Sequence, residues 1–360
     1  MPSAFGAAVT GARLERVRAS PRFLDGAFRN TASVAPGLKP GTALPVMSEY
    51  LLGKARRTPP APLPSVSPLD GWARRVESGL RATWLGHSTV LLEVDGFRVL
   101  TDPVWGDRAS PWSLAGPKRF QPVPVPLSAL PELDAVVISH DHYDHLDLPT
   151  VLALAKREVP FITSLGVGAH LEAWGVPPQR ITELDWWEHV DLRGGLLRLT
   201  AAPAQHFSGR GMGDRNKTLW SSFVVTTDRH RLFFSGDTGL TEEYAEIRAR
   251  LGPFDLTLLE VGAWHPAWGD IHLGPVNALE ALRLLGGGPL LPVHWGTFNL
   301  ALHAWDEPAE SLLELAHTHR ARLVMPRLGQ PVEPAHVESV EPWWRAVGAP
   351  APVPVPAGNS

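Results

Sequence analysis

The sequence predicts a single α/β domain behind an irregular N-terminal arm. From about residue 81 onward, short apolar runs rich in β-branched residues alternate with segments of helical pattern. No internal repeat of roughly 20–50 residues is present. The chain of 360 residues is 44% hydrophobic and 19% charged, which is the composition of a globular protein with a large core.

Composition divides the chain into three regions. Residues 1–80 begin with scattered arginines and continue with a cluster of prolines, so we expect an extended or irregular arm that wraps the core or stays partly disordered. Residues 81–345 carry the alternating strands and helices, and residues 346–360 form an Ala/Pro-rich tail that we expect to be loose. The early arginines leave peripheral contact with an anionic membrane open; they are Arg13, Arg16, Arg18, Arg22 and Arg29.

Charge and residue usage exclude several classes of protein. The net charge is −4 and no long block of Lys or Arg is present, which argues against a nucleic-acid partner. No apolar run reaches the roughly 18 residues of a spanning helix and no secretion signal is evident, so we expect a cytoplasmic protein. Because the chain has no cysteine, a metal site must be built from His, Asp and Glu. The oligomeric state is left open.

Apolar runs and turn residues place the elements of the domain. The predicted strands cover residues 83–94, 97–100, 135–138, 161–163, 188–202, 219–227, 231–235, 256–261, 290–293 and 323–325. Asp95-Gly96 predicts a tight hairpin between the first two strands, and residues 104–131 predict a long loop. The predicted helices cover residues 149–157, 241–250, 277–285 and 308–317.

A dense group of ionisable side chains directly follows one predicted strand. After Ala135–Ile138 come His140, His142, Asp144 and His145 in the pattern His-x-His-x-Asp-His. Open α/β sheets form ligand crevices at strand ends, and imidazole with carboxylate suits zinc, iron or manganese. The alternative is a solvated polar turn, but crowding ionisable groups without a metal is costly. The pattern therefore predicts a metal site, with zinc as the expected ion.

Other His and Asp residues also follow apolar runs. His206, Asp237 and His294 occupy such positions, and they would lie together if these strands shared one end of the sheet. A lone histidine at a strand end is more often a hydrogen-bonded structural residue, so only their recurrence indicates a shared site. Asp102, which ends an earlier strand ahead of Pro103, is either a turn residue or a partner that orients a metal-binding imidazole.

These pieces match a known family in order and spacing. With Thr101-Asp102-Pro103 and Ser-Gly-Asp237-Thr-Gly among them, residues 81 to about 330 resemble the metallo-β-lactamase superfamily. The resemblance implies a four-layer αβ/βα sandwich with two divalent metal ions at one edge. It implies that one metal is held by His140, His142 and His206, that the second is held by Asp144, His145 and His294, and that Asp237 bridges both.

Longer motifs resemble the N-acyl-phosphatidylethanolamine phospholipase D-like branch of that superfamily. They include Trp84-Leu-Gly-His87-Ser-Thr-Val, Leu100-Thr-Asp-Pro-Val-Trp-Gly-Asp-Arg-Ala-Ser-Pro111, Pro203-Ala-Gln-His206 and His294-Trp-Gly-Thr-Phe298. The branch implies a phosphodiesterase of the phospholipase D type that acts on a small-molecule or lipid substrate. The match around Ile271-His272-Leu-Gly-Pro is only partial, so the substrate pocket does not follow from the resemblance.

The implied chemistry assigns expected roles to individual residues. A hydroxide shared by two metals would attack phosphorus, and Asp144, Asp237 and His272 are the candidates for direct participation. His272 would position substrate or donate a proton to the leaving group; its alternative is a surface histidine. His87 and Asp102 are expected beside the ligands. Several tryptophans near the predicted loops belong either to the core or to an apolar groove for acyl chains: Trp105, Trp112, Trp186, Trp187, Trp264, Trp268 and Trp295.

Other functions compete with the phosphodiesterase hypothesis. A lactonase or small-ester hydrolase of the same superfamily is the nearest alternative. A nuclease lacks support from the charge pattern, and a diiron oxygen-reducing member would be expected to have Glu in place of His142. From another class, a non-catalytic metal-binding protein is opposed by the complete ligand set.

Overall fold

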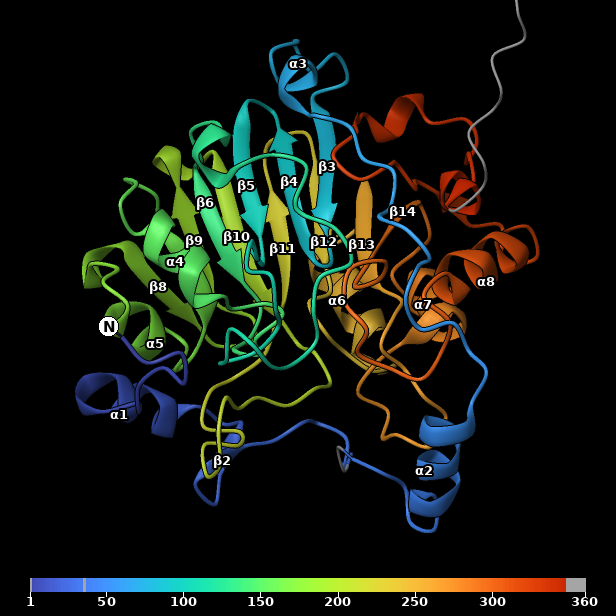
Figure 1. Ribbon diagram of the computed structural model, residues 1–360. Helices are drawn as coiled ribbons and strands as arrows, with labels where there is room; N and C mark the ends of the chain where they lie inside the picture. The colour runs from blue at the N-terminus through green and yellow to red at the C-terminus, as the bar shows by residue number, and fades with distance from the viewer. Residues whose placement is uncertain (1, 35–36, 348–360) are drawn as a thin grey trace, which may run out of the picture.

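Two mixed β-sheets packed face to face form the centre of the structure, and helices cover their outer faces (Figure 1). The computed structural model describes residues 2–34 and 37–347. Each large sheet has seven strands. The layers confirm the α/β class and the αβ/βα sandwich implied by the sequence. Within the described ranges, no helix is long and apolar enough to cross a membrane.

The first sheet is built mainly by the N-terminal half of the domain. Its strands are β3 (Leu80–Gly86), β4 (Thr89–Val94), β5 (Phe97–Thr101), β6 (Ala135–Ile138), β7 (Phe161–Ser164), β8 (Ile181–Leu184) and β16 (Pro331–Val332). Their order in the sheet is β16-β3-β4-β5-β6-β7-β8. Because β5 to β8 pair in parallel, their carboxyl ends lie at one edge.

The second sheet is built by the C-terminal half. Its strands are β9 (His189–Leu192), β10 (Leu197–Ala202), β11 (Ser222–Thr226), β12 (Arg231–Phe234), β13 (Leu256–Glu260), β14 (Pro289–Val293) and β15 (Arg322–Leu323). Their order is β15-β14-β13-β12-β11-β10-β9. Strands β12 to β15 pair in parallel, so this sheet also gathers several carboxyl ends at one edge.

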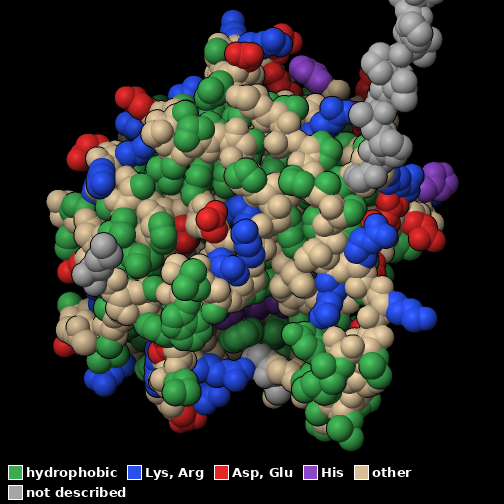
Figure 2. Space-filling model, viewed as in Figure 1, with side chains coloured by type: hydrophobic (Ala, Val, Ile, Leu, Met, Phe, Trp, Pro, Cys, Tyr) green, Lys and Arg blue, Asp and Glu red, His purple; other side chains and the backbone are tan. Residues whose placement is uncertain are grey.

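Helices cover the outer face of each sheet. On the face of the molecule shown in Figure 2, basic, acidic and apolar side chains are mixed. The first sheet is covered by α4 (Leu148–Leu154) and α5 (Gly168–Ala173), and the second by α6 (Glu243–Leu251), α7 (Gly274–Leu284) and α8 (Glu307–Ala316). Short 3-10 turns are η1 (Leu127–Ala129), η2 (Pro178–Arg180), η3 (Arg193–Gly195), η4 (Pro334–His336) and η5 (Trp343–Ala346).

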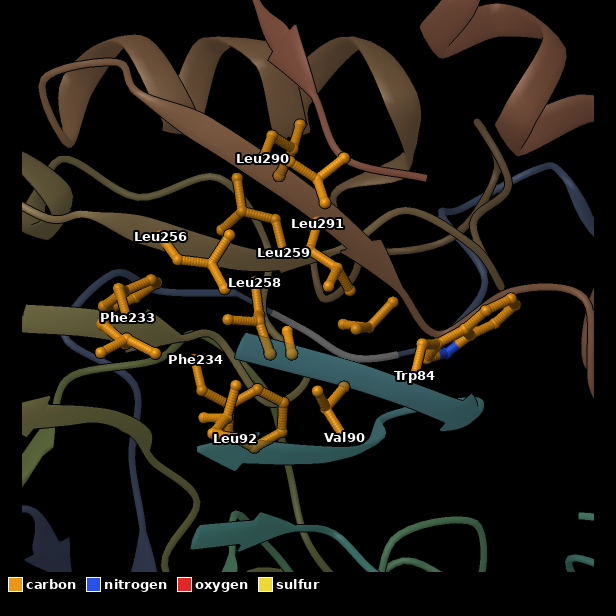
Figure 3. Close-up of a cluster of buried hydrophobic side chains, with 14 of the residues drawn as sticks. Trp84, Val90, Leu92, Phe233, Phe234, Leu256, Leu258, Leu259, Leu290 and Leu291 are labelled. Carbon is orange, nitrogen blue, oxygen red and sulfur yellow. The ribbon is translucent and has the colours of Figure 1, made fainter. Parts of the chain in front are cut away.

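Side chains of the first sheet alternate between two buried clusters. Val90 and Leu92 belong to the cluster between the sheets, whereas Leu91 belongs to the cluster under α4 and α5. Figure 3 shows the inner cluster, where Val90 and Leu92 lie close to Phe234 and Leu258 of the second sheet. Both faces of these strands are buried, which explains their nearly continuous apolar sequence.

One predicted turn is confirmed and one predicted strand is wrong. Val94 pairs with Phe97 across Asp95-Gly96, whose φ angles of 49° and 89° suit a tight hairpin. The predicted strand over residues 83–94 is two strands, because the chain reverses at His87-Ser88 between β3 and β4. Because the strands on both sides of this turn are buried, the apolar pattern continues across it, and the sequence does not show where one strand ends and the next begins.

Short elements account for several other differences, and the predicted strand over residues 219–227 is shorter in the structure, where β11 covers Ser222–Thr226. The predicted strand over residues 188–202 is β9 and β10 separated by η3, and β15 ends at Leu323 rather than at residue 325. The sequence did not predict α5 or β8, which have six and four residues. Helix α5 is too short for a helical period to appear, and β8, with the sequence Ile-Thr-Glu-Leu, lacks the apolar run that indicated the other short strands.

The N-terminal arm contains more regular structure than its composition predicted. It holds α1 (Gly11–Ala19), β1 (Phe23–Leu24), β2 (Ala27–Phe28), α2 (Ala43–Leu52) and α3 (Leu69–Trp72). Arg13 pairs with Glu183 and Glu172, and Val17 and Phe28 are buried against Trp186 and Trp220 of the domain. This part of the arm therefore wraps the core. Most of the predicted loose tail, from residue 348 on, lies outside the described residues.

Candidate metal centre

Histidine and aspartate side chains converge at one edge of the sandwich. They leave the ends of strands from both sheets: His87 after β3, Asp102 after β5, His140 to His145 after β6, His206 after β10, Asp237 after β12 and His294 after β14. Parallel pairing places the ends of β5 and β6 together in one sheet, and those of β12 to β14 together in the other. The structure thus brings together every metal ligand that the sequence proposed.

The first ligand group consists of His140, His142, His206 and Asp237, whose possible ligand atoms lie within 4.8 Å of one another. His142 Nδ1 lies 2.9 Å from His140 Nε2 and 3.2 Å from His206 Nε2. His140, His206 and Asp237 are buried. Three imidazoles and one carboxylate at these separations are a suitable donor set for a divalent metal.

The second ligand group consists of His87, Asp144, His145 and His294, again within 4.8 Å. Asp144 Oδ2 lies 3.0 Å from His87 Nε2, 3.5 Å from His145 Nε2 and 3.4 Å from His294 Nε2. His87, expected beside the ligands, therefore lies among them.

Asp237 lies between the two groups. Its Oδ2 is 3.1 Å from His145 Nε2 and 3.0 Å from His294 Nε2, on the side of the second group. The same oxygen is 3.9 Å from His140 Nε2 and 3.8 Å from His206 Nε2, on the side of the first group. A carboxylate in this position is able to bridge two ions.

Buried atoms without partners show that these residues fit metal ions. Asp237 Oδ1 is buried and has no hydrogen-bond partner, and the close contacts of His145 Nε2 and His294 Nε2 with Asp237 Oδ2 do not have hydrogen-bond geometry. Leaving each such atom unsatisfied costs about 1–3 kcal/mol. A cation within each group would satisfy them.

The protonation of the histidines also fits metal binding. Burial lowers the pKa of His140 and His206 well below its usual value, so both imidazoles are neutral, the form that binds metal. Burial opposes the charged form of His294 as well, but Asp237 and Asp144 raise the pKa of His294 to about 10. Positive charge is therefore favoured beside these two carboxylates, and a metal ion is able to supply it in place of the proton.

Comparison with known proteins identifies the family. The model of the β-lactamase superfamily domain matches residues 97–295, which include the motif at His140 and both Asp237 and His294. The chain belongs to the metallo-β-lactamase superfamily. It is a metal-dependent hydrolase of this superfamily, and its His and Asp groups are able to bind metal.

Relatives place the chain near one branch of the metallo-β-lactamase superfamily. An uncharacterised protein of Mycobacterium tuberculosis is 47% identical over 349 residues, which cover 96% of this chain and 92% of that protein. The N-acyl-phosphatidylethanolamine-hydrolyzing phospholipase D 1 of Caenorhabditis elegans is 40% identical over 250 residues, 66% of this chain and 70% of the relative. The mitochondrial enzyme of that name from Saccharomyces cerevisiae is 34% identical over 258 residues, 69% of this chain and 54% of the relative.

Solved structures show the same fold. The metallo hydrolase Igni18 from Ignicoccus hospitalis has a TM-score of 0.53 at 23% identity, covering 70% of this chain and 97% of its own. An isothiocyanate hydrolase from Delia radicum gut bacteria has a TM-score of 0.55 at 22% identity, covering 70% and 98%. Both likenesses concern the superfamily fold.

A layer of hydrogen bonds holds the candidate ligands in place. Asp102 Oδ2 accepts from His145 Nδ1 at 2.7 Å and from Ser139 Oγ at 2.6 Å, and its Oδ1 accepts from the backbone N–H of Ser139 at 2.7 Å. His206 Nδ1 lies 2.9 Å from the carbonyl oxygen of Ile271. Contacts of this kind fix the tautomer and orientation of an imidazole. Asp102 therefore has the contacts of the orienting partner that the sequence offered as one of two alternatives.

Strained backbone aims several side chains into the centre. His87, Asp102 and His294 have φ angles of 52°, 33° and 65°, in the left-handed region that non-glycine residues seldom adopt. Such residues cost about 1–3 kcal/mol each and occur where surrounding contacts hold them. Here the N–H of His294 donates to the carbonyl of His87 at 3.0 Å, and Thr297 Oγ1 accepts from the N–H of His87 at 2.6 Å.

His272 lies at the edge of the same centre, not on the surface. One of its possible ligand atoms lies within 4.8 Å of those of Asp237 and His294. Its Nδ1 lies 3.1 Å from Glu260 Oε1, which also accepts from the N–H of Leu273 at 2.8 Å. Sequence reasoning missed Glu260, although it ends an apolar strand, which is the signal that located the ligands.

Four of the predicted tryptophans lie in separate places, either in the core or beside different cavities. Trp186 and Trp295 are buried in the core clusters, and Trp295 stacks on Trp84 with ring centroids 5.2 Å apart. Trp112 is 60% exposed and lines a separate cavity. Trp268 lines a cavity of about 670 Å³ beside α2. These four tryptophans therefore lie in different surroundings and do not line one shared acyl groove.

Proposed function

We propose that this protein hydrolyses a phosphodiester bond of a lipid in the manner of a phospholipase D, with an N-acylated phosphatidylethanolamine as the first substrate to test. The observation that carries the proposal is the pair of ligand groups joined by Asp237, which suits a centre for two divalent ions. The substrate class is suggested by the relatives named for N-acyl-phosphatidylethanolamine hydrolysis.

Two bound ions, with zinc expected first and iron or manganese as alternatives, would supply Lewis acidity towards substrate oxygens and lower the pKa of a water. His140, His142, His206 and Asp237 would hold one ion. Asp144, His145 and His294 would hold the other together with Asp237, and His87 lies within reach of that position.

The chain's own side chains would orient the groups and move the proton. Asp102 and Ser139 hold His145 so that its Nε2 faces the centre. Glu260 Oε1 accepts from Nδ1–H of His272, so Nε2 of that ring is available to donate a proton to the leaving oxygen when it carries one. His272 is thus proposed as the proton donor and Glu260 as the residue that positions it.

The test is a parallel screen of purified protein whose metal content is known from elemental analysis. We expect hydrolysis of a generic nitrophenyl phosphodiester and release of phosphatidic acid from N-acyl-phosphatidylethanolamine, because a phospholipase D cuts on the headgroup side of phosphorus. Turnover of lactones without turnover of any diester would replace the proposal by a lactonase. Failure of metal-replete protein on every diester, ester and lactone would favour a non-catalytic metal-binding protein. The cytoplasmic location remains a prediction.

A further inference from the structure

The helix α2 presents an apolar surface that the rest of the described chain does not cover. None of its residues is buried, and Leu44, Leu51 and Leu52 are 83%, 68% and 77% exposed. Leu44, Met47 and Leu51 follow the spacing i, i+3 and i+7, so they form a stripe on one face of the helix. In Figure 1 α2 projects from the lower right of the molecule, and Figure 2 shows a largely hydrophobic lobe at that place.

The charges around this stripe are mainly positive. Glu49, the single acid of α2, lies 3.0 Å from His265 Nε2 and is therefore engaged by the protein. Lys54 and Arg56 follow the helix directly and are exposed, and within residues 2–34 and 37–347 neither side chain has an ion-pair partner. The Arg57 guanidinium lies 4.9 Å from the ring centroid of Tyr50. An apolar helix face bordered by cations is the chemistry of a surface that binds anionic lipids.

The basic start of the chain, which also suggested membrane contact, is largely engaged by the protein itself. Arg16 pairs with Glu188, and Arg22 lies over the ring of Trp186 with its guanidinium carbon 5.4 Å from the centroid. Arg13 is paired as well, so fewer of the early arginines are available to bind a membrane. The surface at α2 is therefore the better candidate for a membrane contact.

The same surface adjoins the metal centre. The cavity of about 670 Å³ beside α2 is lined by Val46, Tyr50, Arg57 and residues 299–302, among others. Arg57 and residues 299–301 also line a smaller cavity that reaches His294. A bilayer in contact with α2 would thus lie on the same side of the protein as the cavity that is lined by His294.

We propose that α2, with Lys54 and Arg56, docks the protein on the surface of an anionic phospholipid bilayer. Leu44, Leu51 and Leu52 would enter the headgroup region, while the two cations remain at the level of the phosphates. With ten residues, or about 15 Å, the helix is too short to span a bilayer, so it would lie in the interface. The projecting stripe and its cationic border favour lipid over a second protein surface. Docking would bring lipid headgroups to the metal centre, and only this consequence rests on the proposed function.

The test is co-sedimentation of the full chain with vesicles of phosphatidylcholine alone or mixed with phosphatidylglycerol. We expect wild type to bind the anionic vesicles more tightly and to lose affinity as salt is raised. The variant L44S/L51S should bind them roughly tenfold or more weakly, because two exposed apolar side chains no longer enter the interface. The variant K54E/R56E should lose the preference for phosphatidylglycerol. The matched control L114S/L196S removes two other leucines, 90% and 51% exposed, and should bind as wild type does.

Two outcomes would overturn the docking surface. One is equal vesicle binding by wild type and both α2 variants, with circular dichroism showing that all are folded. The other is a dimer of the wild type that L44S/L51S converts to a monomer, as measured by light scattering, without vesicle binding by either. Vesicle binding is measured without turnover. If the protein hydrolyses no diester, the measured vesicle binding is unaffected. If the protein does not bind vesicles, hydrolysis of a soluble diester is still expected.

Discussion

The two ends of the sandwich carry the same kinds of side chain and differ in how their polar atoms are paired. At one end, Asp237 and the histidines around it come from loops that follow strands of both sheets. At the other end, Asp95 in the β4–β5 hairpin of the first sheet meets Thr227, Arg229 and His230 between β11 and β12 of the second. Each end thus joins the two sheets through a carboxylate and imidazole.

Only one of these clusters is satisfied by the protein alone. Asp95 Oδ2 accepts from Thr227 Oγ1 at 2.5 Å and lies 2.9 Å from His230 Nδ1, while its Oδ1 pairs with Arg229. Asp237 Oδ1 has no partner at all. A cluster whose buried polar atoms all have hydrogen-bond partners stabilises the fold. A cluster in which some of these atoms lack partners lowers stability and offers sites for ligands. Buried polar atoms that lack a hydrogen-bond partner, more than residue types, distinguish the candidate functional end from the end at Asp95, which we call the structural end.

The largest effect is expected from removing the charge of one carboxylate at each end. Asp237→Asn should lose bound metal and reduce hydrolysis by roughly 100-fold or more, because the carboxylate shared by both ligand groups becomes neutral. Asp95→Asn should keep both metal and activity. Elemental analysis and kcat/KM of the two variants check this. Full metal content and activity in Asp237→Asn would remove Asp237 from the centre.

The next effect separates the two histidine–carboxylate pairs. His272→Ala should lower kcat by roughly 10²–10⁴-fold with metal content retained, as for loss of a proton donor. His230→Ala, which breaks the pair with Asp95, should leave kcat unchanged. Glu260→Gln should lower kcat less than His272→Ala, since the donor remains and only its orientation suffers. Loss of metal in His272→Ala would instead make His272 a ligand.

The sequence predicted the class of fold and the residues that converge at the candidate metal centre, but not their surroundings. The motif from His140 to His145, with His206, Asp237 and His294, could be recognised because each residue follows an apolar run and matches the superfamily in order. Which atoms face one another depends on backbone angles that no pattern reports. His87 shows this, because its φ of 52° turns its ring to Asp144 from within a run that resembled one strand.

The structural end and the arm were predicted less well for related reasons. Asp95 was recognised as a hairpin residue, yet its partners Thr227 and His230 lie more than a hundred positions away in the other sheet. Helix α2 was missed because its apolar residues contact no core, so composition alone suggested an irregular arm. Contacts between distant segments, and helices that bury no side chain, leave little signal in a single sequence.

A smaller effect is expected at two glycines with left-handed φ angles, Gly236 beside the metal centre and Gly96 in the hairpin of Asp95. A Cβ at Gly236, where φ is 55°, would lie 2.7 Å from Cβ of Ser139, and a Cβ at Gly96, where φ is 89°, would meet no atom within 4 Å. Gly236→Ala should lower the free energy of unfolding by about 2–4 kcal/mol through strain and crowding. Gly96→Ala should cost about 1–2 kcal/mol through strain alone. Urea unfolding measures both, and equal losses would show that contact with Ser139 does not constrain the loop that carries Asp237.

The smallest effect is a dependence of stability on pH at the structural end. Burial opposes ionisation of Asp95, but hydrogen bonds from Thr227, His230 and Arg229 outweigh it and lower the pKa of Asp95 below its usual value. Ionised Asp95 therefore stabilises the fold fully above its unfolded pKa of about 4, and this contribution is lost as pH falls through the lower folded value. Asp95→Asn should reduce the free energy of unfolding by about 1–2 kcal/mol at neutral pH. The difference from wild type should shrink as pH falls below about 4.

Urea unfolding of both proteins over a pH series tests this expectation, with Asp228→Asn in the same turn as the control. Asp228 is exposed, so its variant should differ little from wild type at any pH. A gap between wild type and Asp95→Asn that persists unchanged into acid would mean that neutral contacts of the turn, not the charge of Asp95, hold this end of the sheets together. The two ends would then differ in the kind of interaction as well as in its completeness.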